Sequence, residues 1–247
     1  MRYGAHQAQV ADLWRPSNAA GPLRVVVLIH GGFWRQLYTK RLMQGLAEAV
    51  VDHGWAAYNV EYRRVGALGS GGWPHTFEDI SAAVNALAET EGIDLDRVVT
   101  CGHSAGGHLA LWAGTARQTG PGTAPAHPVR PCAAISLAGV VDLVAAARAG
   151  VGGGAVEALM GGRPEDVPER YVLGSPAAQL PLGIPQTLIH GLDDATVPAS
   201  LSRDYVDRAV MRGDDARYVP LPGAGHMEMI DPHGAALSEI ARCLDRF

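Results

Sequence analysis

The chain has 247 residues, of which 47% are hydrophobic and 18% charged, a composition that can bury a sizeable core within one domain. Its net charge of -5 provides no basic surface, so nucleic acid is not expected as a partner. No segment approaches the roughly 18 consecutive apolar residues of a membrane span, and the first residues lack an apolar run of signal-peptide length.

The candidate strands are short apolar runs, rich in β-branched residues, that end at glycine or polar turns. In chain order they span residues 23–32, 54–62, 97–104, 132–139, 185–191 and 216–223. Polar and apolar residues do not alternate in them, which is typical of strands buried on both faces of a parallel sheet. Residues 6–14 alternate more clearly and are interpreted as an exposed edge strand.

Helical patterns separate these runs. Apolar residues recur at steps of three and four over residues 40–53, 76–90, 106–117, 200–213 and 234–247. At the second helix, Thr76 and Asp79 resemble a capping box. The alternation of strand and helix predicts an α/β fold with a parallel sheet covered on both faces, over one domain that spans residues 1–247.

Two segments interrupt this alternation. Residues 118–131 are rich in Pro and Gly and are predicted to form a loop. Residues 140–184 contain one short helical pattern near AVEALM, and their place before a late strand makes them a candidate cap over a site. A plain surface excursion is the alternative.

A G-x-S-x-G motif, GHSAG, lies between a predicted strand and a predicted helix. With 31 glycines in the chain, such a match arises by chance about one time in seven, so its context must decide. A strand before it and a helix after it are the context of a nucleophile elbow. Ser104 is therefore the candidate nucleophile, and the N–H of Ala105 is a candidate oxyanion donor.

A second motif, HGGFW, begins at His30 and ends the most apolar strand run. Consecutive glycines let backbone N–H groups turn toward a ligand, as the donors of an oxyanion hole do. A plain turn between strand and helix is the alternative interpretation.

Two later loops supply a candidate acid and a candidate base. HGLDDATVP follows the run at 185–191 and offers Asp193 and Asp194, either of which can orient a histidine. GAGHMEM places His226 in a glycine-flanked loop after the last strand run. The order Ser, Asp, His, each after a strand end, is that of α/β-hydrolases. The histidines that accompany the motifs are interpreted as structural: His30, His103, His108 and His190.

The motifs HGGFW, GHSAGGHLAL, HGLDDATVP and GAGH resemble those of the α/β-hydrolase superfamily of serine hydrolases, over essentially the whole chain. The resemblance implies a mostly parallel central sheet, helices on both faces and a short cap insertion. It also implies that Ser104, Asp194 and His226 are catalytic, because the family acid stands three residues before the Val-Pro pair. YNVEYRR and GGWPHTFEDISAAVNAL are similar to the small esterase branch, in which Asp79 is structural.

The same resemblance assigns the oxyanion hole to the amides of Gly32, Phe33 and Ala105. Phe33 stands where many esterases with this motif have a third glycine. The pattern HGG-x-W is similar to that of kynurenine formamidases. It is also tolerated in bacterial esterases of the feruloyl-esterase-like type. Phe33, Trp34 and Trp73 are candidate walls of an aromatic substrate pocket, with core packing as the alternative.

These features predict a carboxylesterase-like serine hydrolase that cleaves small-acyl esters through an acyl-enzyme on Ser104. The alternatives are an arylformamidase that hydrolyses N-formylkynurenine and a non-hydrolytic binding protein on the same fold. His226 and His233 lack H-E-x-x-H spacing and the cysteines lack a zinc pattern, so neither a metal nor a cofactor is expected.

The expected partner is a small-molecule ester or aryl amide substrate, without nucleic acid or membrane, and a homodimer is compatible with the sequence. The three cysteines have no close spacing, which favours reduced thiols and a cytoplasmic location. They are Cys101, Cys132 and Cys243.

Overall fold

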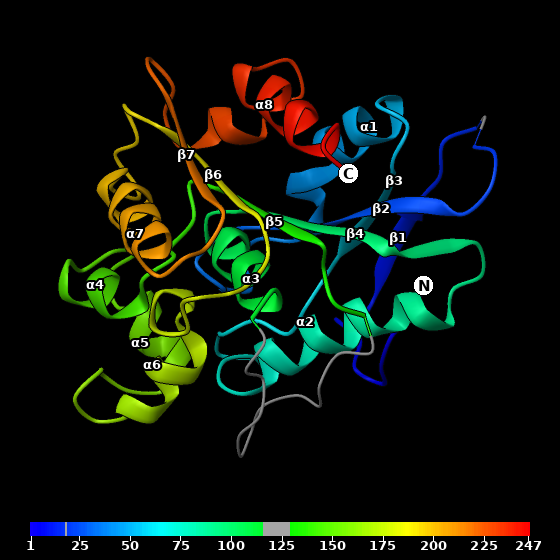
Figure 1. Ribbon diagram of the computed structural model, residues 1–247. Coiled ribbons are helices and arrows are strands. Elements are labelled where there is room, and N and C mark those ends of the chain that lie inside the picture. Colours follow the sequence, from blue (N-terminus) through cyan, green and yellow to red (C-terminus); the bar gives the residue numbers. More distant parts are fainter. Residues whose placement is uncertain (18, 116–128) are drawn as a thin grey trace.

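One mostly parallel sheet organises the chain (Figure 1). The computed structural model describes residues 1–17, 19–115 and 129–247. In these residues, seven strands are ordered β1-β3-β2-β4-β5-β6-β7. They are β1 (Ala11–Trp14), β2 (Leu23–Ile29), β3 (Ala56–Val60), β4 (Ile93–His103), β5 (Ala133–Leu137), β6 (Gln186–Gly191) and β7 (Ala216–Leu221). β1 pairs with β3 in the antiparallel sense, and every other neighbouring pair is parallel.

Helices cover both faces of the sheet. They are α1 (Gln44–Asp52), α2 (His75–Asn85), α3 (Ala105–Ala113), α4 (Leu143–Arg148), α5 (Ala155–Met160), α6 (Pro168–Gly174), α7 (Ser200–Met211) and α8 (Ala235–Leu244). Figure 1 shows α1 and α8 above the sheet and α2 and α3 below it. Among the described residues, no helix combines the length and the apolar character that crossing a membrane requires.

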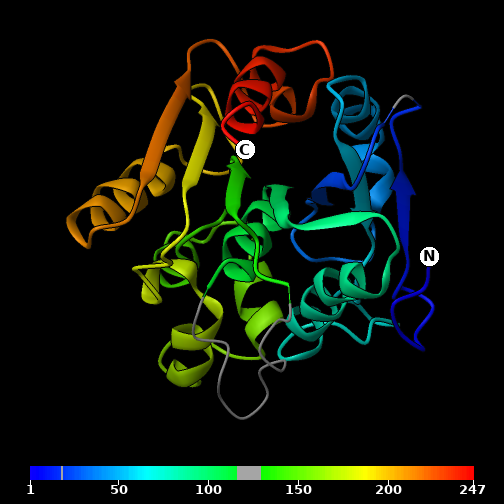
Figure 2. The same cartoon turned by 45° about the vertical axis from the view of Figure 1, so that its right-hand side comes forward.

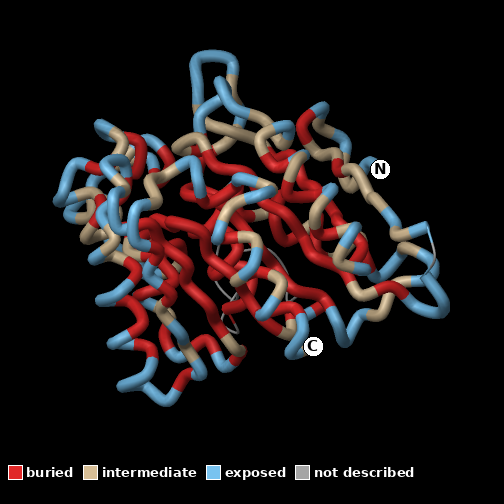
Figure 3. The backbone as a smooth tube through the Cα atoms, turned by 90° about the horizontal axis from the view of Figure 1, so that it is seen from above, coloured by how far each residue is buried: buried red, intermediate tan, exposed pale blue. Residues whose placement is uncertain are grey.

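Side-chain alternation along β2 divides the core into two layers. Val26 and Leu28 belong to the apolar cluster under α1 and α8, whereas Val25 and Val27 belong to the cluster with α2 and α3. Every residue of β3, β5 and β6 is buried. Seen from above, buried backbone runs through the middle of the molecule and exposed backbone lies around it (Figure 3). Burial on both faces is the reason that the strand sequences do not alternate.

The second helix begins differently from the prediction. It starts at His75 after Pro74, and the proposed capping box of Thr76 and Asp79 is wrong. Thr76 Oγ1 donates to the carbonyl oxygen of Arg63 at 2.6 Å, and the Asp79 carboxylate accepts from the Arg63 guanidinium at 2.7 Å. Both side chains are buried and bind Arg63, which follows β3, rather than capping the start of their own helix.

Residues 140–184 form α4, α5 and α6 rather than the single short helix expected from sequence. Figures 1 and 2 show these helices together on the side of the sheet that carries α3, away from α1 and α8. The Pro- and Gly-rich loop predicted at 118–131 lies outside the described residues up to position 128.

Candidate active site

Ser104 lies in the sharp turn between β4 and α3. Its φ of 55° is in the left-handed region, which residues other than glycine rarely adopt. Such a backbone conformation is typical of a strained nucleophile elbow. The turn needs glycine on either side, because a Cβ on Gly102 would lie 2.0 Å from the Gly106 oxygen, and one on Gly106 would lie 2.0 Å from the Ile29 oxygen. The elbow therefore holds Ser104 at the carboxyl edge of the sheet, close to the end of β2.

His226 and Asp194 come from the loops after β7 and β6 and form a direct pair. His226 Nδ1 lies 2.7 Å from Asp194 Oδ2. A carboxylate only accepts, so Nδ1 carries the proton of this hydrogen bond, and Nε2 of the neutral ring keeps its lone pair. The neighbouring Asp193 is exposed, so the structure brings Asp194 and not Asp193 to the histidine.

Asp194 accepts three further hydrogen bonds. The N–H groups of Thr196 and Val197 reach Oδ1 at 2.7 and 2.9 Å, and His190 Nε2 lies 3.2 Å from Oδ2. Burial raises the pKa of Asp194, but the hydrogen bonds from His190, His226 and Val197 outweigh it and hold the pKa well below its usual range. The side chain is therefore an ionised, fixed acceptor behind His226.

His103 supports the same histidine from the other side. Its Nε2 donates to the carbonyl oxygen of His226 at 3.0 Å, and the two rings lie 4.6 Å apart. Burial, followed by the proximity of His226, lowers the pKa of His103 to about 3. A ring that stays neutral adds no repulsion when His226 takes up a proton.

The HGGFW turn lies directly beside Ser104. A Cβ added to Gly31 would lie 3.1 Å from Ser104 Cβ. Gly32, Phe33 and Trp34 all have positive φ angles, of 108°, 52° and 56°. Within the described residues, the N–H groups of Gly32 and Phe33 donate no hydrogen bond to another residue. They are thus free to serve an oxygen of a ligand, as is expected of oxyanion donors.

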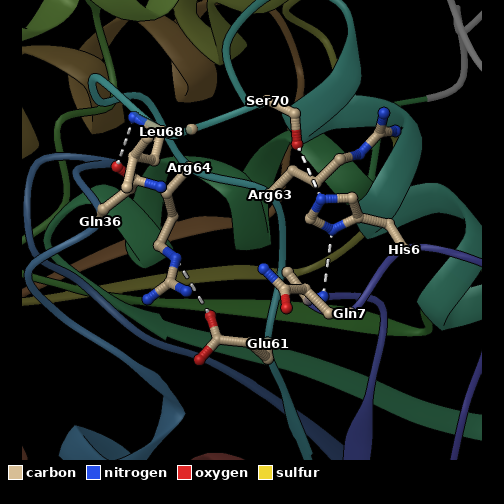
Figure 4. A pocket seen from close by; sticks show the side chains of 10 residues that line it. His6, Gln7, Gln36, Glu61, Arg63, Arg64, Leu68 and Ser70 are labelled. Atoms are coloured by element: carbon tan, nitrogen blue, oxygen red, sulfur yellow. Dashed lines mark hydrogen bonds and ion pairs between the residues drawn. The ribbon is translucent and has the colours of Figure 1, made fainter.

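A buried hydrogen bond anchors the start of this turn. His30 Nε2 lies 2.9 Å from Glu61 Oε1, and the His30 ring stacks on Tyr62 with centroids 4.4 Å apart. Burial raises the pKa of Glu61, but its contacts with His30 and Arg64 lower it by more. The net pKa is below the usual value, so the carboxylate is held ionised. Figure 4 shows Glu61 and Arg64 in the wall of a separate polar cavity of about 290 Å³, which shares no residue with the Ser104 cavity.

Ser104 and His226 open into one cavity of about 230 Å³. Its walls are Gly32, Phe33, Tyr38, Leu42, His103, Ser104, Thr196, His226 and Met227. Sequence reasoning missed Tyr38, Leu42, Thr196 and Met227. Thr196 and Met227 are within two residues of Asp194 and His226, and that proximity was the signal that could have found them.

The two tryptophans expected in the substrate pocket lie elsewhere. Trp34 is fully buried and packs edge-on against His108 at 5.4 Å. Trp73 packs against Phe77 at 5.0 Å. The structure brings neither tryptophan to the cavity of Ser104: Trp34 belongs to the buried core, and Trp73 is partly buried against it.

The chain is similar in sequence to known esterases. A family model described as BD-FAE matches residues 11–208. Esterase LipC of Mycobacterium tuberculosis is 27% identical over 261 residues, which cover 99% of this chain and 63% of LipC. A probable isoprenylcysteine alpha-carbonyl methylesterase of Arabidopsis thaliana is 25% identical, over 96% of this chain and 53% of its own. The chain therefore spans less than two thirds of either relative.

Solved structures share the fold. A truncated carbohydrate esterase from gut microbiota superposes with a TM-score of 0.82 at 19% identity, over 100% of this chain and 94% of its own. Propionate-bound esterase 2 of Thermogutta terrifontis superposes with a TM-score of 0.78 at 22% identity, over 100% and 92%. The α/β-hydrolase fold expected from sequence is thus confirmed.

Proposed function

The chain belongs to the BD-FAE family, and from this membership we propose that it is a serine hydrolase that cleaves small-acyl carboxylic esters through an acyl-enzyme on Ser104. Its membership confirms the resemblance to α/β-hydrolase esterases that the motifs carry. The Mycobacterium tuberculosis and Arabidopsis thaliana relatives are both named as esterases, which supports an ester as the substrate.

The observation that carries the proposal is the hydrogen bond of 2.7 Å between His226 and Asp194, with His226 and Ser104 in the wall of one cavity. A serine hydroxyl is a weak nucleophile unless a base accepts its proton. An imidazole with a free Nε2, held in that tautomer by an ionised acid, is such a base.

In the first half of the reaction, Ser104 Oγ attacks the ester carbonyl carbon and its proton passes to His226 Nε2. The His226 imidazolium, stabilised by Asp194, then protonates the leaving alcohol. In the second half, His226 takes a proton from water, which attacks the acyl-enzyme, and returns that proton to Ser104 as the acid product leaves.

Negative charge on the tetrahedral carbonyl oxygen would be met by the N–H groups of Gly32, Phe33 and Ala105. The first two have no other acceptor among the described residues. Ala105 is the first residue of α3, where the helix dipole adds positive potential. One donor of this kind typically contributes about 10²–10³ to the rate.

The cavity supports a small, uncharged substrate group. Its volume is about 230 Å³ and its walls include Phe33, Tyr38, Leu42 and Met227, without Asp, Glu, Lys or Arg. An apolar wall gives a charged acyl group no partner after desolvation.

An arylformamidase is the second candidate, because two aromatic side chains, Phe33 and Tyr38, line the cavity beside Ser104. The two candidates are separated by kcat/KM for N-formylkynurenine and for short p-nitrophenyl esters, measured on the same preparation. A value many orders lower for the formamide removes this candidate.

Replacement of Ser104 by Ala tests the nucleophile. Ser104→Ala should abolish ester hydrolysis and labelling by a fluorophosphonate, while the far-ultraviolet circular dichroism and Tm stay close to wild type. Hydrolysis at the wild-type rate by this variant would refute the assignment. Wild-type protein that is folded yet not labelled would instead favour a non-hydrolytic binding protein on this fold.

The cysteines support a cytoplasmic location as part of this proposal. Cys101, Cys132 and Cys243 are all unpaired thiols. Free thiols persist where the cell keeps them reduced.

A further inference from the structure

The HGGFW turn contains two consecutive bulky residues in the left-handed region, Phe33 at φ 52° and Trp34 at φ 56°. L-residues with large side chains avoid this region and persist in it only where the surrounding structure fixes them. The turn that carries the proposed oxyanion amides therefore depends on supports around it.

Two supports come from the main body of the fold. The Trp34 ring is fully buried against His108, and the Trp34 carbonyl oxygen accepts from the Val65 N–H at 2.7 Å. The Tyr38 ring covers Gly32, where an added Cβ would lie 2.4 Å from the ring. These contacts hold Trp34 and Gly32 but leave Phe33 between them.

Phe33 is held by the insertion at residues 140–184. A Cβ added to Gly152 would lie 2.4 Å from Phe33 Cδ1 and 2.6 Å from Cε1, so the ring occupies the space of the absent side chain. Arg35, which follows the turn, donates from one guanidinium nitrogen to the carbonyl oxygens of Gly152 and Gly153, at 3.0 and 3.2 Å.

The loop 150–154 between α4 and α5 has the shape that these contacts need. Its four glycines, Gly150, Gly152, Gly153 and Gly154, all have positive φ, at 67°, 71°, 55° and 78°. Glycine adopts positive φ without the steric cost that a side chain brings, and here the loop presents two successive carbonyl oxygens to the same guanidinium.

We propose that loop 150–154 is a positioning element for the oxyanion turn: Gly152 seats the Phe33 ring, Arg35 ties the loop to the turn, and together they fix the Phe33 amide beside Ser104. The inference rests on the proposed function, since it assigns the Phe33 amide to the oxyanion. It gives the insertion a part in the reaction although none of its residues lines the cavity. It also assigns a role to Phe33, because a glycine at this position would have no ring to pack against Gly152.

A matched pair of substitutions tests the proposal. Gly152→Ala and Gly153→Ala both place a Cβ at a positive φ, but only the first meets Phe33, because nothing lies within 4 Å of a Cβ on Gly153. With p-nitrophenyl acetate, Gly152→Ala should lower kcat by about tenfold or more, since a displaced oxyanion donor is worth up to about 10²–10³. KM should change little, and Gly153→Ala should remain close to wild type in both parameters.

A double-mutant cycle ties the loss to the ring. In a Phe33→Gly background there is no ring for the new Cβ to displace, so Gly152→Ala should cause no further decrease in kcat. Equal losses in Gly152→Ala and Gly153→Ala would overturn the proposal, because loop strain alone would then be the cause. The proposal would also be overturned if Gly152→Ala kept the full kcat for p-nitrophenyl acetate and lost activity only toward longer esters. Phe33 would then act only as a wall of the substrate cavity.

Crystal structures of the two variants test the role of loop 150–154 without a substrate. The segment 32–34 should be displaced in Gly152→Ala and unchanged in Gly153→Ala, and an unchanged turn in both would refute the inference. Wild-type protein that hydrolyses no ester would count against the proposed function, while this structural result would still decide the role of the loop.

Discussion

Four hydrogen-bond donors converge on the Asp194 carboxylate. Two are backbone N–H groups of its own loop, from Thr196 and Val197, and two are ring nitrogens, from His190 and His226. His190 Nε2 also faces the Val197 carbonyl oxygen, so this nitrogen carries the proton. A carboxylate with every oxygen engaged does not reorient, and its lowered pKa keeps it ionised. Its negative charge therefore faces His226 through the whole catalytic cycle.

Loss of that charge should remove most of the activity. We expect Asp194→Asn to lower kcat/KM for a short p-nitrophenyl ester by about 10⁴-fold, because Asn favours the wrong tautomer of the histidine and does not stabilise its imidazolium. Asp193→Asn is the matched control: it neutralises the adjacent but exposed aspartate and should stay within about twofold of wild type. Similar losses in both variants would contradict the assignment of Asp194.

Sequence reasoning found the residues whose place depends on chain order and missed those whose place depends on packing. Ser104, Asp194 and His226 each follow a strand end, and the ends of parallel strands meet at one edge. Trp34 stands next to Phe33 in the same turn, yet one side chain lines the cavity and the other is buried. Which way each ring points depends on the positive φ angles of the turn, which no sequence pattern reveals.

At the scale of elements, the elbow is a three-way contact between β2, β4 and α3. The first turn of α3 lies so close to the end of β2 that Gly106 faces the carbonyl oxygens of Ile29 and His30. Backbone does not yield as a flexible side chain does, so glycine is the only residue that allows this approach. The close contact is what brings Ser104 beside the HGGFW turn.

Gly106→Ala should accordingly destabilise the fold. Its Cβ would lie 2.0 Å from the Ile29 oxygen, and we expect the free energy of unfolding, measured by urea denaturation, to fall by more than about 4 kcal/mol. Gly45→Ala in α1 is the control, since its Cβ would meet only the Pro232 ring at 3.1 Å. A change within about 1 kcal/mol is expected there, as alanine is the better helix former. Comparable stability of both variants would show that the elbow is not close-packed.

The elements themselves were predictable to different degrees. The buried strands were found because short apolar runs bounded by glycine or polar turns have few other uses in a folded chain. In the insertion, α5 was expected from the pattern AVEALM, whereas α4 and α6 were missed, because each helix has only six or seven residues and glycines separate them. Helices this short do not form on propensity, so their stability comes from contacts that the sequence does not display.

At the scale of the whole molecule, two buried histidines bear on the response to acid. His103 lies at the end of β4 and His108 in α3, and both donate from Nε2 to a backbone carbonyl oxygen. Burial lowers the pKa of His103 to about 3 and, against an opposing hydrogen bond to Gly174, that of His108 to about 4. In the unfolded chain both rings take up protons near pH 6.5. The unfolded state therefore binds more protons than the native state between these values.

It follows that stability falls as the pH is lowered from 7 to 4.5, by about 2 kcal/mol for each of the two rings. Asp194 and Glu61 have lowered pKa values, so they stabilise the fold above the ordinary carboxyl range near pH 4 and lose that contribution as the pH falls below it. The change in stability between pH 7 and pH 4.5 therefore reports mainly on histidines. In His108→Gln the amide can still donate to Gly174 but does not titrate.

The decrease in the free energy of unfolding between pH 7 and pH 4.5, measured by urea denaturation at both pH values, should therefore be smaller in His108→Gln by about 2 kcal/mol. His233→Gln, which alters an exposed ring, should show the same decrease as wild type. The comparison concerns the pH dependence rather than stability itself, so a packing cost of the substitution cancels. An equal decrease in His108→Gln and wild type would mean that His108 takes up its proton in the native state.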